Sequence, residues 1–217
     1  MKLVNFTLIG MGILVSSAIF GGQTSHAAEA SKAVTESKFE LEAGGETVPE
    51  ILDPEIKPPT GQKGPLSLDA VSNFTFPTKK LGTEANAPLE VAPLKDEKLG
   101  LQLTDERGQD IGWNLKVSAT AFKTSDDKLE LKGAVMTIPE GKLATKEGVD
   151  LSLTPTAYAV ALSTTQKSIM VATSTQGRST WVNSFEGKGE KVTLAVPSGN
   201  KVAAYKSTIT WSLEDAP

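Results

Sequence analysis

Alternating apolar and polar residues recur along most of this chain, and the alternation restricts it to short β-strands. In the run WNLKVSATA, residues 113–121, the apolar side chains share one parity and the polar ones share the other. The run AAYKSTITWSL, residues 203–213, repeats the arrangement and contains a second Trp-x-Leu triplet. Because the side chains of a strand alternate between two faces, each run predicts a strand with one buried face and one wet face.

The same alternation continues elsewhere, broken by turn sequences such as EGKG at residues 186–189 and PSGN at residues 197–200. No stretch carries the sustained apolar stripe of an amphipathic helix. Many short strands of this kind indicate a β-sandwich or a barrel. We predict about nine or ten strands and an all-β fold, an antiparallel, Greek-key-like β-sandwich. The other runs lie at residues 65–76, 99–103, 129–138, 150–154, 157–162, 168–173, 179–185 and 191–197.

Residues 1–27 have the organisation of a secretory signal peptide. Lys2 supplies the positive start, residues 8–20 form an apolar segment, and Ser25-His26-Ala27 is a small-x-Ala cleavage site. As a helix the apolar segment would be about 20 Å long, which is short for a bilayer core. We expect an exported protein with no membrane span after processing. An uncleaved anchor and cleavage after Ala30 are the alternatives.

Residues 28–64 are rich in acidic residues, Gly and Pro and contain few large apolar side chains. Such a segment buries too little surface to offset the entropy of ordering it. We predict a disordered, Pro-containing, flexible linker over residues 28–64 and a β domain over residues 65–217. A short strand at residues 37–41 is the one exception that the alternation allows.

The composition excludes several classes of function. The formal net charge is −4, and removal of Lys2 with the signal peptide makes the remaining chain more acidic, so no nucleic acid partner is expected. The chain has no Cys, and its one His, His26, leaves with the signal peptide. A Ser-His-Asp triad, a Cys nucleophile and an ordinary zinc site are therefore excluded. We predict no catalytic residue, metal or cofactor.

Carboxylates are the remaining means of catalysis, since glycoside hydrolysis needs only two of them. The Asp and Glu residues lie mostly in turns or on the polar parity of strands, which indicates solvated surface positions. Asp126 and Asp127 lack the spacing of a calcium loop, so we interpret them as an exposed turn. A carboxylate-dependent hydrolase stays a minor alternative to a binding protein.

Trp113 and Trp211 allow two interpretations. Each shares its parity with Leu two residues later, which favours a place in the core, whereas an exposed indole would offer a stacking surface for sugar rings. In the first case the opposite parity would form the wet face that meets solvent or a wall polymer. Trp181 is either an edge aromatic or a cap on the core. The opposite-parity residues are Asn114, Lys116, Lys206, Thr208 and Thr210.

The two Trp-x-Leu triplets, with the second at the C-terminus, give the chain a family resemblance. The terminal sequence Tyr205-KST-Ile209-Thr210-Trp211-Ser212-Leu213-EDA-Pro217 is similar to the C-terminal signature of the WxL-domain surface proteins of Gram-positive bacteria, with Ile209 in place of the usual Leu. Trp113-Asn114-Leu115 matches the first motif, and the resemblance covers about residues 50–217. The matching signature residues, with a wall-binding or a structural role, are Trp113, Leu115, Tyr205, Thr210, Trp211, Leu213 and Pro217.

The resemblance implies a non-covalent attachment to the cell wall through peptidoglycan or another wall polymer. It also implies partner proteins at the cell surface, and for some members adhesion to host matrix. No sortase signal follows Leu213, so we expect retention without a covalent bond. The expected function is a wall-binding subunit of a surface complex. The alternative is an interaction or adhesion subunit that binds another surface protein or host extracellular matrix.

Overall fold

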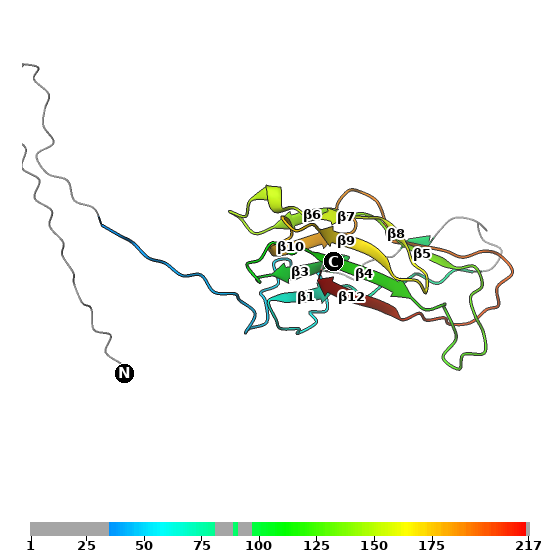
Figure 1. Ribbon diagram of the computed structural model, residues 1–217. Coiled ribbons are helices and arrows are strands. Elements are labelled where there is room, and N and C mark those ends of the chain that lie inside the picture. The colour runs from blue at the N-terminus through cyan, green and yellow to red at the C-terminus, as the bar shows by residue number, and fades with distance from the viewer. Residues whose placement is uncertain (1–34, 81–88, 91–96, 216–217) are drawn as a thin grey trace, which may run out of the picture. The chain divides into compact units, whose positions relative to one another are not determined.

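Strands make up nearly all regular structure in the part of the chain that the computed structural model describes, residues 35–80, 89–90 and 97–215. One 3-10 helix, η1 (Leu151–Leu153), accompanies twelve strands (Figure 1). The all-β prediction is therefore confirmed. The predicted signal peptide lies outside the described residues. Within them, no helix has the length and apolar character that crossing a bilayer requires.

The strands form three antiparallel sheets of four strands each. We name each sheet after one of its inner strands. The β3 sheet has the order β1 (Leu66–Val71), β3 (Gly100–Asp105), β10 (Ser179–Ser184), β6 (Lys142–Thr145). The β4 sheet has the order β12 (Ile209–Asp215), β4 (Trp113–Ala119), β9 (Lys167–Ala172), β7 (Thr156–Ala157). The β5 sheet has the order β2 (Leu89–Glu90), β11 (Thr193–Ala195), β5 (Val135–Ile138), β8 (Val160–Ala161).

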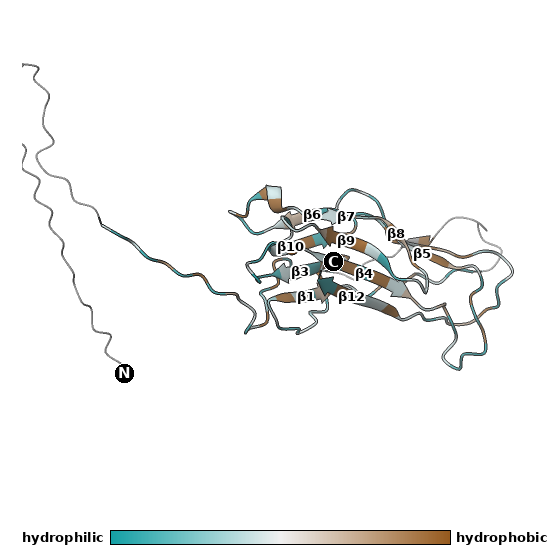
Figure 2. Ribbon diagram, in the orientation of Figure 1, coloured by the Kyte–Doolittle hydropathy of each residue, from teal (hydrophilic) through white to brown (hydrophobic). Residues whose placement is uncertain are grey.

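Consecutive strands of the described chain always enter different sheets, so no sheet neighbours are consecutive in sequence. Each strand therefore pairs with strands that do not directly precede or follow it in the described chain, as in the crossovers of Greek-key sandwiches. The main core receives side chains from all three sheets. Figure 2 shows hydrophobic residues concentrated in the strands and hydrophilic residues in many of the connecting segments.

Strand β4 follows the predicted alternation. Its burial alternates residue by residue, and Trp113, Leu115 and Val117 are completely buried. The opposite parity is only partly buried. The sequence pattern thus identified the inward face of this strand correctly.

Strand β1 departs from the predicted parity because it contains a bulge. The register between β1 and β3 shifts at Asp69, so Leu68 pairs with Leu103 and faces the main core, whereas Ala70 pairs with Gln102. Ala70 instead packs in a second cluster with Ile56 and Val182. A bulge adds one residue to a strand and reverses the parity beyond it, and the alternation alone did not reveal this.

Part of the predicted linker packs against the β3 sheet. Ile56 is 1% exposed in the second cluster. The side chain of Gln102 accepts a hydrogen bond from the Leu52 amide and donates one to the Glu50 carbonyl, at 2.7 and 2.8 Å. The Thr60 amide donates to the Asp69 carbonyl at 2.7 Å. We call residues 50–60 the covering segment. Both faces of β1, β3 and β10 are consequently buried along most of each strand, where the pattern had predicted one wet face.

Residues 35–40 differ from the covering segment, since all of them are exposed and carry no regular structure. The chain divides into two units, Met1–Glu40 and Leu41–Pro217. The alternation at residues 37–41 did not produce the short strand that it allowed.

Two of the segments that were predicted to be strands have a different structure from the predicted one. Residues 150–154, DLSLT, form η1, because the Asp150 carboxylate accepts a hydrogen bond from the Ser152 amide and caps the turn at its start. This hydrogen bond lowers the pKa of Asp150 below its usual value. The run at residues 157–162 contributes only Ala157 to β7 and the two residues Val160–Ala161 to β8. Strands β2 and β6 were not predicted, which accounts for the larger number of strands.

Candidate binding site

The two Trp-x-Leu motifs lie side by side on neighbouring antiparallel strands. Strand β12 pairs with β4 so that Leu213 lies opposite Leu115 and Trp211 lies opposite Val117. Because paired residues share a face, both motifs direct their Trp and Leu side chains toward the core. The two motifs therefore lie on one pair of neighbouring strands in the β4 sheet.

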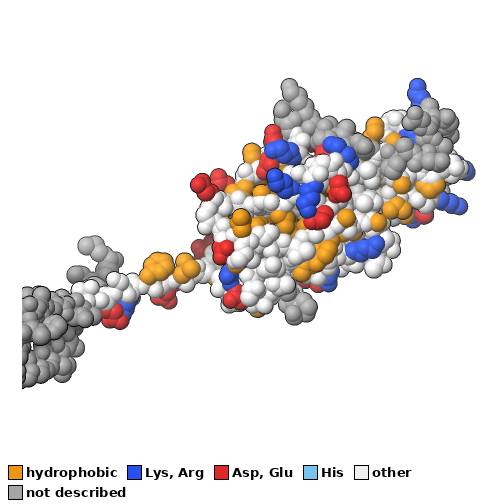
Figure 3. Space-filling view, turned by 90° about the horizontal axis from the view of Figure 1, so that it is seen from above, with side chains coloured by type: hydrophobic (Ala, Val, Ile, Leu, Met, Phe, Trp, Pro, Cys, Tyr) orange, Lys and Arg blue, Asp and Glu red, His pale blue; other side chains and the backbone are white. Residues whose placement is uncertain are grey.

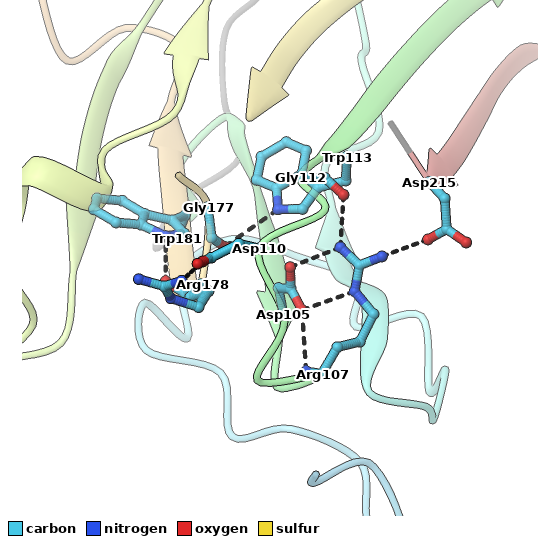
Figure 4. A network of polar contacts seen from close by, with 9 residues as sticks. All are labelled: Asp105, Arg107, Asp110, Gly112, Trp113, Gly177, Arg178, Trp181 and Asp215. Atoms are coloured by element: carbon cyan, nitrogen blue, oxygen red, sulfur yellow. Dashed lines mark hydrogen bonds and ion pairs between the residues drawn. The ribbon is translucent and has the colours of Figure 1, made fainter. Parts of the chain in front are cut away.

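Trp113 is a core residue and offers no surface to a ligand. Its side chain is completely buried, and its ring Nε1 donates a hydrogen bond to the Gly177 carbonyl at 3.2 Å (Figure 4). The next carbonyl, that of Arg178, accepts a hydrogen bond from Nε1 of Trp181 at 2.9 Å. Trp181 is 1% exposed, so it belongs to the core as well. One short turn thus satisfies the polar atoms of two buried indoles.

Gly177 makes this arrangement possible. Its φ angle is +82°, and a Cβ atom at this position would lie 2.4 Å from Nε1 of Trp113 and 2.4 Å from Cβ of Ala172. Only glycine fits both the backbone conformation and the close approach of the indole. The next residue on the same turn, Arg178, is tied by an ion pair to Asp110 in the loop before Trp113.

Arg107 connects the start of the first motif to the end of the second. Its guanidinium donates to both carboxylate oxygens of Asp105, at 3.0 and 2.8 Å, and to the Gly112 carbonyl at 2.7 Å (Figure 4). It also forms an ion pair with Asp215. Asp105 is buried and holds the pKa of Arg107 above its ordinary value, so the charge persists at all physiological pH values. The sequence analysis did not single out this residue.

The second motif is less deeply buried than the first. Trp211 and Leu213 are partly buried and pack against the main core. The Trp211 ring stacks on Phe185, with ring centroids 6.4 Å apart and 5° between the planes, and Phe185 stacks on Phe74 at 6.1 Å. Phe185 is completely buried. We call these three rings the aromatic column. Thr210 is exposed on the opposite face, and Pro217 lies outside the described residues.

The aromatic column ends at a groove on the surface. This groove has a volume of about 850 Å³ and lies between the segment that follows β1 and the segment that leads into β12. Phe74 and Tyr205 both contribute to its lining. The Tyr205 hydroxyl donates to the Lys201 carbonyl at 2.7 Å, which closes a loop along one wall. The signature residue Tyr205 therefore helps to shape an open site, and Trp211 supports that site through Phe185 and Phe74.

Only some of the residues that were predicted to form the wet face lie on a common face. Asn114, Lys116 and Thr210 share the outer face of the β4 sheet, but Lys206 lines the groove. Lys116 forms an ion pair with Glu214 at 2.6 Å, which lowers the pKa of Glu214. The face seen in Figure 3 shows cationic and anionic side chains interspersed with hydrophobic ones. This mixture does not select a charged ligand.

Two carboxylates that were expected on the surface are buried. Asp69 accepts hydrogen bonds from Ser67 Oγ, Gln102 Nε2 and Thr104 Oγ1, at 2.6, 2.9 and 2.6 Å. Asp105 is held by Arg107. The prediction of solvated carboxylates was therefore wrong for these two residues. The bulge turns Asp69 toward the side that the covering segment closes, where the neighbouring hydroxyl and amide groups satisfy its oxygens.

The Asp126-Asp127 segment forms the exposed turn that the sequence indicated. The Asp126 carboxylate accepts hydrogen bonds from Thr124 Oγ1 and from the Lys128 amide, and the first of these is the main cause of its lowered pKa. Both side chains are exposed. The carboxylate thus has partners within its own turn.

These features define a β-sandwich domain that is built around buried tryptophans and carries an open aromatic groove. A family model for the WxL domain, described as a surface cell wall-binding domain, matches residues 28–217. The chain therefore belongs to the WxL domain family, as its two motifs suggested. A comparison with curated proteins and a comparison with solved structures found no match.

Proposed function

We propose that this protein binds the cell wall without a covalent bond, through peptidoglycan, and serves as a subunit of a cell-surface complex. The match of the WxL family model over residues 28–217 carries the proposal, because the family is described as wall-binding. The resemblance of the two motifs to those of Gram-positive surface proteins is the reason for proposing peptidoglycan as the polymer. On this proposal residues 1–27 are a secretion signal.

The state of the buried carboxylates supports binding over catalysis. A glycoside hydrolase needs two carboxyl groups that face the scissile bond. Asp69 and Asp105 instead have their oxygens occupied by hydrogen bonds from the protein. Both serve as structural acceptors in the core.

Sedimentation with purified sacculi tests the proposal. The protein is incubated with peptidoglycan sacculi from Gram-positive cells and centrifuged, at low and at high salt. We expect it to pellet with sacculi under both conditions, because stacking and shape contribute binding that salt does not screen. Protein that stays in the supernatant at both salt concentrations contradicts wall binding. Release of muropeptides during the incubation would support the hydrolase alternative.

Two exposed apolar side chains favour a second role, in which the protein docks on a partner surface protein. Phe39 and Leu41 are 89% and 83% exposed. They share one parity of an extended segment, as in a peptide that recognises a groove or a sheet edge. Adhesion to host matrix is a further form of this role.

Substitution of these two residues separates the two roles. In the F39S/L41S variant we expect crosslinking to neighbouring surface proteins on intact cells to fall, while sedimentation with sacculi stays unchanged. A matched variant, Glu40→Gln, keeps the apolar pair and provides the control. Unchanged crosslinking in the F39S/L41S variant would remove the support for docking through this segment.

A further inference from the structure

Among the described residues, all the charged side chains that line the groove beside Tyr205 are positive. Four of these residues are lysines, Lys79, Lys80, Lys201 and Lys206, and none of them is Asp or Glu. The chain as a whole has a net charge of −4, so this positive lining is a local concentration against the overall charge. A surface of this kind attracts an anionic partner.

Two of these lysines are available for such a partner. Lys201 and Lys206 are exposed, and among the described residues neither forms an ion pair. They lie on the segment that leads into β12, whereas Lys79 and Lys80 lie on the segment after β1. Charges therefore line the groove from two separate segments.

The wall that carries Lys201 and Lys206 is fixed by backbone hydrogen bonds. Lys206 and Lys123 exchange a pair of them at 2.8 Å, and the Thr120 amide donates to the Thr208 carbonyl at 2.9 Å. These bonds fix the backbone at Lys206 before a ligand arrives. The hydrogen bond from the Tyr205 hydroxyl ties the Lys201 carbonyl to the same wall.

The apolar part of the lining combines aromatic and aliphatic side chains and rests on the core. Phe74 connects the groove to the aromatic column through Phe185 and Trp211. Tyr205 and Pro197 add further flat surface. Such surfaces pack against C–H groups of a flexible polymer, while lysines contact charges that recur along it.

We propose that this groove binds a polyol-phosphate wall polymer, a chain with one negative charge at each phosphodiester and C–H-rich units between them. Lysine ammonium groups suit phosphate as point charges, and the aromatic lining suits the units that separate the phosphates. The proposal rests on the wall-binding function and deepens it, since it names the site and a second wall ligand in addition to peptidoglycan. It also gives the second motif a role in binding, because Trp211 supports, through Phe185, the Phe74 ring that lines the groove.

Titration with purified poly(glycerol phosphate) tests the proposal, with K201Q/K206Q as the variant. The matched control is K142Q/K146Q, which removes the same charge from two exposed lysines that do not line the groove. We expect K201Q/K206Q to bind at least about tenfold more weakly than the unmodified protein, as expected for the loss of two charge-assisted contacts. We expect the control to bind as the unmodified protein does.

Three results would overturn the proposal: no binding of poly(glycerol phosphate), equal affinities of the two variants, or equally tight binding of polyglutamate. The last would mean that any polyanion is accepted, so that phosphate has no special role. Thermal unfolding of both variants verifies that they remain folded, which we expect because all four substituted side chains are exposed.

A second sedimentation experiment distinguishes a failure of this inference from a failure of the proposed function. Sacculi are compared before and after hydrofluoric acid removes their phosphate polymers. Weaker pelleting after treatment supports the groove, and equal pelleting contradicts it while leaving peptidoglycan binding intact. If neither preparation pellets the protein, wall binding fails, and the titration of the two variants still decides what the groove binds.

Discussion

At the scale of single residues, Trp113 is a buried core residue. Trp113 is completely buried, and its ring N–H is satisfied by the Gly177 carbonyl. An unsatisfied donor in this position would cost about 1–3 kcal/mol, so the turn at Gly177 is as necessary as the indole itself. The first motif therefore requires a glycine 64 residues away in the sequence.

Substitution of Gly177 tests this dependence. Gly177 and Gly148 have the same φ angle, +82°, but a Cβ at Gly148 meets nothing within 4 Å. Gly148→Ala introduces only the backbone strain, about 1–2 kcal/mol. We expect Gly177→Ala to lower the free energy of unfolding by about 1–3 kcal/mol more, because its Cβ also displaces the indole. Chemical denaturation measures both, and equal losses would contradict the close approach.

Fluorescence quenching tests the depth of the three tryptophans. Trp113 and Trp181 are at most 1% exposed, whereas Trp211 is only partly buried. We expect Trp211→Phe to remove most of the emission that acrylamide quenches, and Trp181→Phe to leave it. Strong quenching that persists in the Trp211→Phe protein would show that another indole reaches solvent.

Sequence parity predicted Trp113 correctly but left open how deeply each tryptophan is buried. Parity states which face a side chain occupies, and depth depends on the neighbours that other segments bring. Trp211 lies on an edge strand and is therefore partly open. For the same reason the burial of Asp69 was missed, because it requires both a bulge and the covering segment.

At the scale of elements, the pairing of β4 with β12 is the central feature. All seven residues of β12 have partners on β4. Outside the core, the pair is reinforced by Lys116 and Glu214. Residues 113–121 and 203–213 both alternate between apolar and polar, and this alternation predicted two strands. It does not predict that the two strands pair with each other, because pairing depends on contacts between distant parts of the chain.

The Lys116–Glu214 pair makes the stability depend on pH. The lysine lowers the pKa of Glu214 in the folded state, so its contribution is present above the unfolded pKa, near 4.5, and is lost as the pH falls through the folded pKa. We expect Glu214→Gln to be slightly less stable than the unmodified protein at pH 7 and equal to it at about pH 2, well below the unfolded pKa. Thermal unfolding across this range measures the difference.

Glu147→Gln is the control for this experiment. Glu147 is exposed and forms no ion pair among the described residues. If both variants show the same dependence on pH, the cross-strand pair does not contribute.

At the scale of the whole molecule, the covering segment enlarges the domain beyond its strands. The sequence suggested a linker over residues 28–64 because the segment is polar and rich in Pro. The buried side chain of Ile56, with Ile51 and Leu52 packed against the same cluster, and hydrogen bonds to Gln102 seat residues 50–60 on the β3 sheet. Average composition cannot detect a few anchoring residues.

Shortened proteins test this extent. We expect a chain that starts at residue 44 to unfold at the same temperature as one that starts at residue 28. A chain that starts at residue 62 should be less stable, since it exposes Ala70 and the polar group around Asp69. Ile56→Ala in the longer chain should cost about 2–5 kcal/mol. Equal stability of all four proteins would return residues 50–60 to the linker.

The late position of β12 has a consequence for biogenesis. During synthesis from the N-terminus, residues 209–215 appear after every other described strand, so until then β4 lacks one of its two neighbours. The nascent polypeptide therefore stays incomplete along one border, with hydrophobic side chains such as Leu115 insufficiently shielded and prone to self-association. A chaperone or translocation factor that holds this intermediate until termination would raise the yield of correctly folded product.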